Sequence, residues 1–114
     1  MVVHRGEVWW TDLAEPRGSE PGYRHPVLVL QADSFNRSRV RTVVGVIVSS
    51  NLGLLDAPGN VLLRGKSVGL PRDSVANLTQ FVTVDRDYLE ERIGRVSQKT
   101  LARIDAGLRL VLDL

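Results

Sequence analysis

Two short, uninterrupted runs of aliphatic residues constrain the fold of this 114-residue chain more than any other feature. They read PVLVLQ at residues 26–31 and TVVGVIVSS at residues 42–50. An apolar run of this length, bounded by turn-forming residues, is typical of a strand that is covered on both faces. Neither approaches the roughly 20 residues that a membrane-spanning helix needs. The chain is therefore expected to build a sheet around two buried, central strands.

Other segments supply the rest of the sheet. GEVWWTDL at residues 6–13, VLLRG at 61–65 and the alternating VANLTQFVTV at 75–84 predict three more strands. A long loop is expected at residues 14–24, AEPRGSEPGYR, because it holds two prolines and two glycines and little apolar content. Gly45, in the middle of the second aliphatic run, suggests a bend or a bulge there.

The end of the chain predicts a helix. Ser97 is a good N-cap, and Val96 and Leu101 stand at the positions of a hydrophobic staple. An apolar stripe at helical spacing follows, made of Leu101, Ile104, Leu108 and Val111. About five strands and one terminal helix predict an α+β, mainly β fold. We expect a small, strongly curved antiparallel sheet or half-open barrel, as a single domain over residues 1–114.

Composition excludes several kinds of site. The sequence has no cysteine, which excludes disulfides, thiolate metal sites and a cysteine nucleophile. His4 and His25 are the only histidines, which argues against a histidine-rich metal site. A cysteine-free chain fits a reducing compartment, and the first residues lack the apolar segment of a signal peptide. We therefore expect a cytoplasmic protein with no membrane partner.

The positive charge is carried almost wholly by arginine, with Lys66 and Lys99 the only lysines among 15 basic residues. Guanidinium groups bind phosphate bidentately and stack on flat bases. Arg37, Arg39 and Arg41 alternate, so an extended segment would place them on one face. Such a face is either a solvated strand edge protected by its charge or a patch that follows a phosphate backbone.

An ordered set of short motifs resembles one family. RGEVWWTDL, GSEPGYRHPVLVLQAD, SSN, PGNV, GLPRDSV, TQFVTVD and IGRVS occur in sequence along essentially the whole chain. Together they are similar to the MazF/PemK-type toxins of type II toxin–antitoxin systems. This resemblance implies a compact MazF/PemK/CcdB-like sheet, a homodimer, and an endoribonuclease that needs no metal or other cofactor. It also implies single-stranded RNA as substrate and a cognate antitoxin whose disordered tail occupies the RNA groove.

The resemblance implies a catalytic group as well. RNA can be cut without metal when its own 2′-OH attacks the adjacent phosphorus, which leaves a 2′,3′-cyclic phosphate and a 5′-OH. In the family, an arginine before the strand-opening proline and a hydroxyl near the end of the next strand serve this reaction. Here His25 stands directly before Pro26, the arginine is one place back at Arg24, and the hydroxyl position aligns with Ser49.

This departure has three readings. His25 can be the general acid or base while Arg24 clamps the phosphate. Arg24 can enter the site alone while His25 stacks or caps. The exchange can also leave a weakened or specialised enzyme. Neighbouring side chains of an extended strand point opposite ways, so both could enter one site only through a bulge or a loop conformation.

Further polar residues are candidates for binding RNA bases. Glu20 could accept from a base amino group or orient His25, and it could equally be a solvated loop carboxylate. Asn51 is a base ligand or a turn former. Trp9 and Trp10 could stack on bases, although such a pair more often divides between core and surface. The expected substrate-binding residues are Ser19, Glu20, Ser50, Asn51, Thr79 and Gln80.

Two other functions stay open from the sequence. Related small barrels poison DNA gyrase by binding it, which would make the terminal helix critical and the Arg24–His25 pair dispensable. A nucleic-acid-binding module without turnover is the other alternative.

Overall fold

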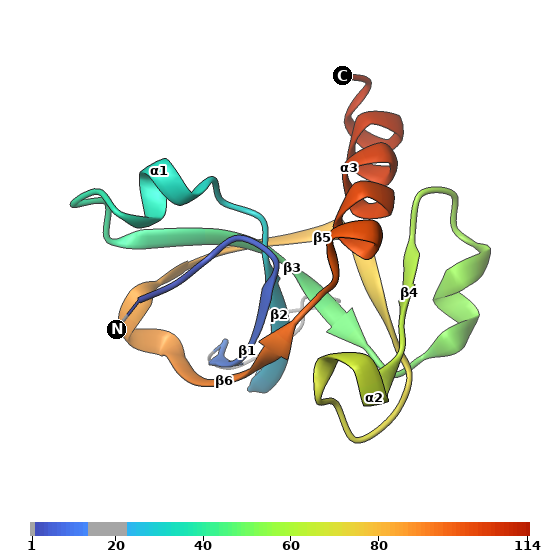
Figure 1. The fold of residues 1–114 in the computed structure, drawn as a ribbon, viewed down its shortest axis with the longest axis horizontal. Helices are drawn as coiled ribbons and strands as arrows, with labels where there is room; N and C mark the ends of the chain where they lie inside the picture. Colours follow the sequence, from blue (N-terminus) through green and yellow to red (C-terminus); the bar gives the residue numbers. More distant parts are fainter. Residues whose placement is uncertain (1, 14–22) are drawn as a thin grey trace.

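The computed structural model of the chain describes residues 2–13 and 23–114. It is mainly β, as the sequence predicts, and three α-helices and two 3₁₀ helices accompany the strands (Figure 1). The strands are β1 (Glu7–Asp12), β2 (Arg24–Val29), β3 (Thr42–Ser49), β4 (Val61–Leu63), β5 (Ser74–Asp85) and β6 (Leu89–Arg95). The helices are α1 (Asp33–Asn36), η1 (Leu52–Asp56), α2 (Gly65–Val68), η2 (Arg86–Tyr88) and α3 (Gln98–Leu112).

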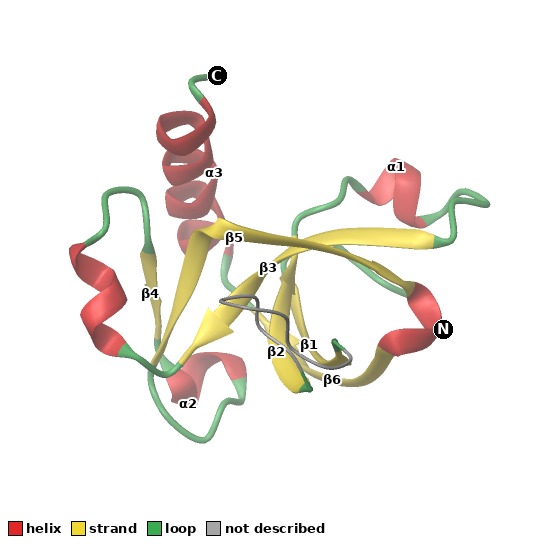
Figure 2. Cartoon of the chain, turned by 180° about the vertical axis from the view of Figure 1, so that it is seen from behind, coloured by secondary structure: helices red, strands yellow, loops and turns green. Residues whose placement is uncertain are grey.

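All six strands form one antiparallel sheet in the order β4-β5-β3-β2-β1-β6. The sheet is strongly curled, and α3 stands against it beside β4 and β5 (Figure 2). The two aliphatic runs form β2 and β3 at the centre, which confirms their predicted place. Pairing of Leu28 with Val46 and of Val27 with Ile47 fixes the register between these two strands.

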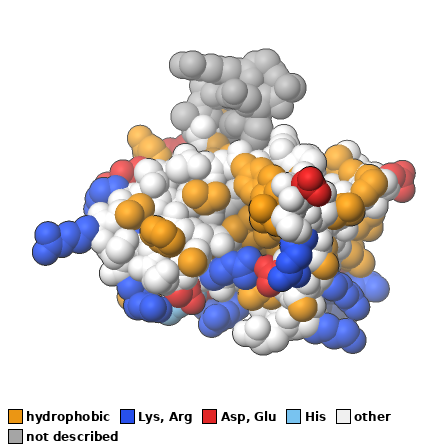
Figure 3. Space-filling model, turned by 90° about the horizontal axis from the view of Figure 1, so that it is seen from above, with side chains coloured by type: hydrophobic (Ala, Val, Ile, Leu, Met, Phe, Trp, Pro, Cys, Tyr) orange, Lys and Arg blue, Asp and Glu red, His pale blue; other side chains and the backbone are white. Residues whose placement is uncertain are grey.

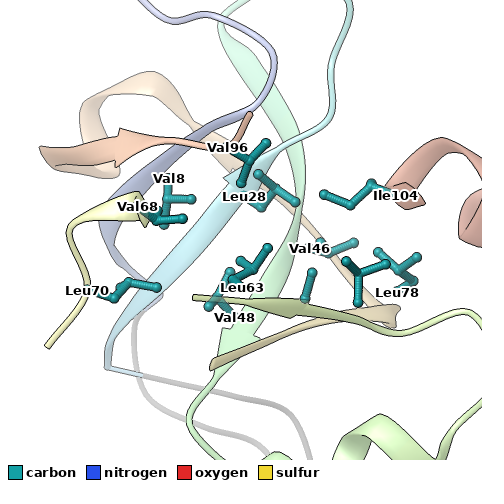
Figure 4. Packing of buried hydrophobic residues seen from close by; sticks show 12 residues of the cluster. Val8, Leu28, Val46, Val48, Leu63, Val68, Leu70, Leu78, Val96 and Ile104 are labelled. Atoms are coloured by element: carbon teal, nitrogen blue, oxygen red, sulfur yellow. The ribbon is translucent and has the colours of Figure 1, made fainter. Parts of the chain in front are cut away.

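Each face of the sheet carries its own apolar cluster, because side chains alternate along every strand. Val8 and Leu28 lie on one face, in the cluster that Figure 4 shows between the sheet and α3. Trp9 and Val29, the next residue of each strand, belong to a second cluster on the other face. Leu28 and Val29 are both 0% exposed, so β2 is covered on both sides as its sequence predicts.

The terminal helix forms as expected. Ser97 is its N-cap, and the Ser97 hydroxyl oxygen accepts a hydrogen bond from the Thr100 N–H at 3.1 Å. Ile104 is fully buried against the sheet, and Leu101 packs on the same cluster as Val96. In the part of the chain that the structure describes, no helix is both long enough and apolar enough to cross a membrane.

The edge strand β6 is the main element that the sequence analysis does not predict. Its sequence, LEERIGR, shows no clear alternation, and most of its side chains are exposed or half-buried. A tertiary contact with β1 holds β6 in place, and the sequence of β6 alone does not predict this contact. The buried Glu7 carboxylate accepts from the Arg92 Nε at 2.6 Å, and from the His4 backbone N–H and the Trp9 ring N–H.

The prediction of an extended arginine face at residues 37–41 is wrong. These residues form the turn that follows α1, and β3 begins only at Thr42. Arg41 pairs with Asp85 at 3.2 Å and Asp87 at 3.1 Å, and both carboxylates raise the pKa of its guanidinium. On the face that Figure 3 shows, basic side chains occur in separate places and not as one stripe.

The expected irregularity near Gly45 lies two positions further along. Val46 pairs with Phe81 and Val48 with Ala76, so two steps along β3 correspond to five along β5. The extra residues of β5 form its bend. Gly45 itself serves close packing, because a Cβ there would lie 2.5 Å from the Leu28 carbonyl oxygen.

Asp33 gives the fold a pH-dependent contact. Its carboxylate accepts from the Arg5 backbone N–H at 2.7 Å and from the Asn36 side chain, and the Arg5 bond is the main reason that its pKa is lowered. A lowered pKa contributes stability above the unfolded value, near 3.8, and that stability is lost as pH falls through the folded value. We expect Asp33→Asn to lower the free energy of unfolding at pH 7. The difference from the parent should shrink below pH 4 in urea denaturation, and a constant difference would contradict the assignment.

Candidate functional site

A cavity of about 310 Å³ lies at one end of the sheet, where four adjacent strands begin or end. The start of β2, the end of β3, the start of β5 and the last half of β1 all contribute to it. Its lining consists of Trp10, Arg24, His25, Pro26, Val48, Ser49, Ser50, Leu70, Pro71, Arg72 and Ser74. Ser49 is half-buried, and Arg24, Ser50 and Arg72 are exposed, so the cavity combines an apolar floor with polar groups that solvent reaches.

Pro26 explains why β2 and β3 separate at this end. The Leu30 N–H donates to the Val44 carbonyl on β3, and alternation directs the backbone of Leu28 and Pro26 toward β3 as well. Proline has no N–H to donate to Val48, its partner in this register. The β2–β3 pairing accordingly ends at Val27, and the unpaired strand ends line the cavity.

Arg24 is held in place by three groups. Its guanidinium lies 4.6 Å from the centre of the Trp10 ring, a cation–π contact. Its Nε donates to Glu90 at 2.9 Å, and a terminal nitrogen donates to Glu91 at 3.4 Å. All three partners come from β1 and β6, the neighbouring strands on that side. The Arg24 side chain remains 50% exposed, so the ion pairs are of the weak, solvated kind.

His25 and Arg24 face opposite ways in a regular strand. The β1–β2 register runs without a shift from Val8–Leu28 to Asp12–Arg24, so the structure has no bulge between the two side chains. Both reach the cavity because it lies at the end of the sheet. Continuing the β2–β3 register by two residues sets His25 opposite Ser49. Within the described part of the chain, the His25 side chain has no hydrogen-bond partner, whereas its backbone pairs with Thr11 of β1.

The Ser49 hydroxyl has a defined donor and acceptor role. Its oxygen accepts from the Asn51 backbone N–H at 3.1 Å, so its own hydrogen can be donated to another group. Ser50, the next residue, also lines the cavity. The structure thus brings together four of the residues that the sequence analysis selects, Arg24, His25, Ser49 and Ser50.

The other selected residues lie elsewhere. Asn51 caps η1, where its side chain accepts from the Gly53 N–H at 3.1 Å, as a turn former does. Thr79 and Gln80 lie in the bend of β5 and not in the cavity lining. Gln80 accepts from the Asn77 side chain at 2.8 Å, so it helps to hold that bend. Ser19 and Glu20 lie outside the described residues.

The two tryptophans divide between core and surface as the sequence analysis expects, and the structure adds two polar residues that the sequence analysis did not select. Trp10 is half-buried and supports Arg24, whereas Trp9 is buried in the second apolar cluster. Arg72 and Ser74 also line the cavity. Their signal was the GLPRDSV motif, which gave no reason to prefer one of its residues. Among the described residues, no group of three or more histidines or acids is placed to hold a metal ion.

The family described as PemK-like, MazF-like toxin of type II toxin–antitoxin system matches residues 4–112. The chain belongs to this family.

Relatives of the family match over the full chain. Endoribonuclease MazF6 of Mycobacterium tuberculosis is 46% identical, and the match covers all of both chains. Endoribonuclease EndoA of Bacillus subtilis is 34% identical over 100% of this chain and 97% of its own. A solved structure, an endoribonuclease in complex with its cognate antitoxin from Mycobacterial species, is 26% identical with a TM-score of 0.75. That match covers 99% of this chain and 95% of the solved chain. The PemK/MazF resemblance and the fold that it implies are thereby confirmed.

Proposed function

We propose that this chain is an endoribonuclease, the toxin of a type II toxin–antitoxin pair, which cleaves single-stranded RNA without a metal ion. The observation that carries the proposal is the cavity at the strand ends, which gathers Arg24, His25 and Ser49 in a chain whose family relatives are named endoribonucleases. An imidazole, a guanidinium and a hydroxyl can together move protons and stabilise negative charge on phosphate.

The reaction needs two proton transfers. The 2′-OH loses its proton, its oxygen forms a bond to phosphorus, and the bond from phosphorus to the 5′-oxygen breaks. That oxygen then takes up a proton, which leaves a 2′,3′-cyclic phosphate and a 5′-OH. We assign one of the two proton transfers to His25, as general acid or general base, and the other to solvent water, because an imidazole can both accept and donate a proton whereas a guanidinium remains charged.

Arg24 and Ser49 stabilise the charge that develops on phosphate. The Glu90, Glu91 and Trp10 contacts hold the Arg24 guanidinium at the cavity, so it is oriented before RNA arrives. The Ser49 oxygen is already occupied as an acceptor, so its hydrogen is directed to a phosphate oxygen. Donors fixed in advance cost no reorganisation when charge develops.

The same proposal covers the substrate and the partners. Unpaired bases can be splayed from a single strand into pockets. Ser50 would bind a base in the cavity, and Ser19, Glu20, Thr79 and Gln80 remain the predicted ligands of bases beyond it, whereas the Asn51 side chain caps η1. The antitoxin complex of a relative supports a cognate antitoxin as partner. A homodimer and a cytoplasmic location complete the proposal.

The test is cleavage of a long single-stranded RNA by the purified protein in excess EDTA. We expect discrete cuts whose upstream fragments end in a 2′,3′-cyclic phosphate, and no cuts in the same sequence as a duplex. Cleavage that disappears with EDTA would refute the metal-free reaction. Binding without cuts would favour a binding module, and intact RNA with trapped gyrase–DNA complexes would favour a gyrase poison.

A further inference from the structure

Two guanidinium groups line the cavity, and they differ in whether a described carboxylate pairs with them. Arg24, on the β2 side, has two carboxylate partners, Glu90 and Glu91. Arg72, on the β5 side, has no ion-pair or hydrogen-bond partner for its guanidinium within the described residues. β3 separates the two strands in the sheet order, so the two cations stand on different sides of the Ser49–Ser50 end.

The neighbouring acid does not neutralise Arg72. The Asp73 carboxylate accepts from the Gly65 N–H at 2.9 Å and lies 3.7 Å from an Arg64 nitrogen. Asp73 is therefore bound to the start of α2. An exposed guanidinium beside a cavity, with no acidic partner among the described residues, is suited to bind an anion, and its planar fork matches phosphate.

The Arg72 backbone is also fixed in position. Its carbonyl oxygen accepts from the Ser74 hydroxyl at 3.2 Å, and Ser74 is buried at the start of β5. The carbonyl carbon of Arg72 lies 2.7 Å from where a Gly65 Cβ would be, so α2 packs directly on this backbone. A side chain that extends from a fixed backbone presents its charge at a defined place.

We propose that Arg72 is a further substrate-binding residue, which holds a phosphate of the RNA next to the scissile one, on the opposite side of the Ser49–Ser50 strand end from Arg24. The inference rests on the proposed function and adds a phosphate ligand to it. Because this phosphate does not react, Arg72 binds the ground state and the transition state alike. Its loss therefore raises KM and leaves kcat nearly unchanged.

The experiment compares Arg72→Gln with Arg109→Gln, which removes the same charge from an exposed position in the last turn of α3. Binding is measured with a 2′-O-methyl RNA oligonucleotide, which cannot be cut, between 50 and 200 mM salt. We expect Arg72→Gln to bind about tenfold more weakly at 50 mM and to lower the slope of log K against log salt by about 0.7. Arg109→Gln should match the parent in both.

Cleavage assays complete the comparison. Arg72→Gln should cut at the same sites with about a tenfold higher KM, and Arg72→Lys should recover the salt slope because it keeps the charge. Equal slopes for Arg72→Gln and Arg109→Gln would overturn the inference. So would a fall in kcat at unchanged KM. Failure of the parent itself to cut RNA would instead overturn the proposed function.

Discussion

Replacing His25 with alanine is expected to lower the rate of RNA cleavage by about 10²–10⁴-fold, the contribution of a positioned acid–base group. The side chain has no hydrogen-bond partner among the described residues, and it is half-buried near the start of β2, where it lines the cavity. Its removal should therefore leave the free energy of unfolding and RNA binding close to those of the parent. The measurement is the single-turnover rate, with thermal unfolding and oligonucleotide binding recorded on the same samples.

Arg24→Ala is the matched comparison for His25→Ala. We expect it to lower the rate by about 10²–10³-fold through loss of charge stabilisation, and to weaken RNA binding as well. The two variants differ in RNA binding, which Arg24→Ala should weaken and His25→Ala should leave close to that of the parent. A parent-like rate for His25→Ala, with activity abolished by Arg24→Ala, would show that Arg24 acts alone.

Replacing Ile104 with alanine is expected to have the largest effect on the fold. The side chain is 0% exposed and joins α3 to the cluster that contains Leu28, Val46 and Leu78 (Figure 4). Truncation of a buried isoleucine leaves a cavity and costs about 2–5 kcal/mol of the free energy of unfolding. Urea denaturation measures this cost.

Leu110 on the same helix is the control for Ile104. It is 63% exposed, so Leu110→Ala should change the free energy of unfolding by no more than about 0.5 kcal/mol. Equal losses for the two variants would show that α3 does not pack as described.

The sequence alone predicts those strands whose own pattern of apolar residues shows which of their faces are buried. The aliphatic parts of β2 and β3, residues 27–29 and 43–48, are apolar on both faces because both faces are covered there. β6 was missed because it lies at an edge, where exposed Glu90 and Glu91 hide the period of its pattern. What places it is the contact of Arg92 with the buried Glu7, far away in the sequence.

The sequence predicted only part of the candidate site. Arg24, His25 and Ser49 could be selected because the family resemblance ties them to a strand-opening proline and a strand end. Arg72 could not, since only the packing of α2 and β5 brings its loop to the cavity. The bend of β5 also lay beyond prediction, because an amide network between Asn60 and Asn77 stabilises it.

Pro26, which separates β2 from β3, also deprives one backbone oxygen of β3 of a hydrogen-bond donor. The Val48 carbonyl lacks the amide hydrogen that a different residue 26 would supply, and Val48 lines the cavity. Val48 is 1% exposed, so this oxygen is closed to solvent and to a base. A residue 26 with an N–H would extend the β2–β3 ladder to the strand ends and draw the two sides of the cavity together.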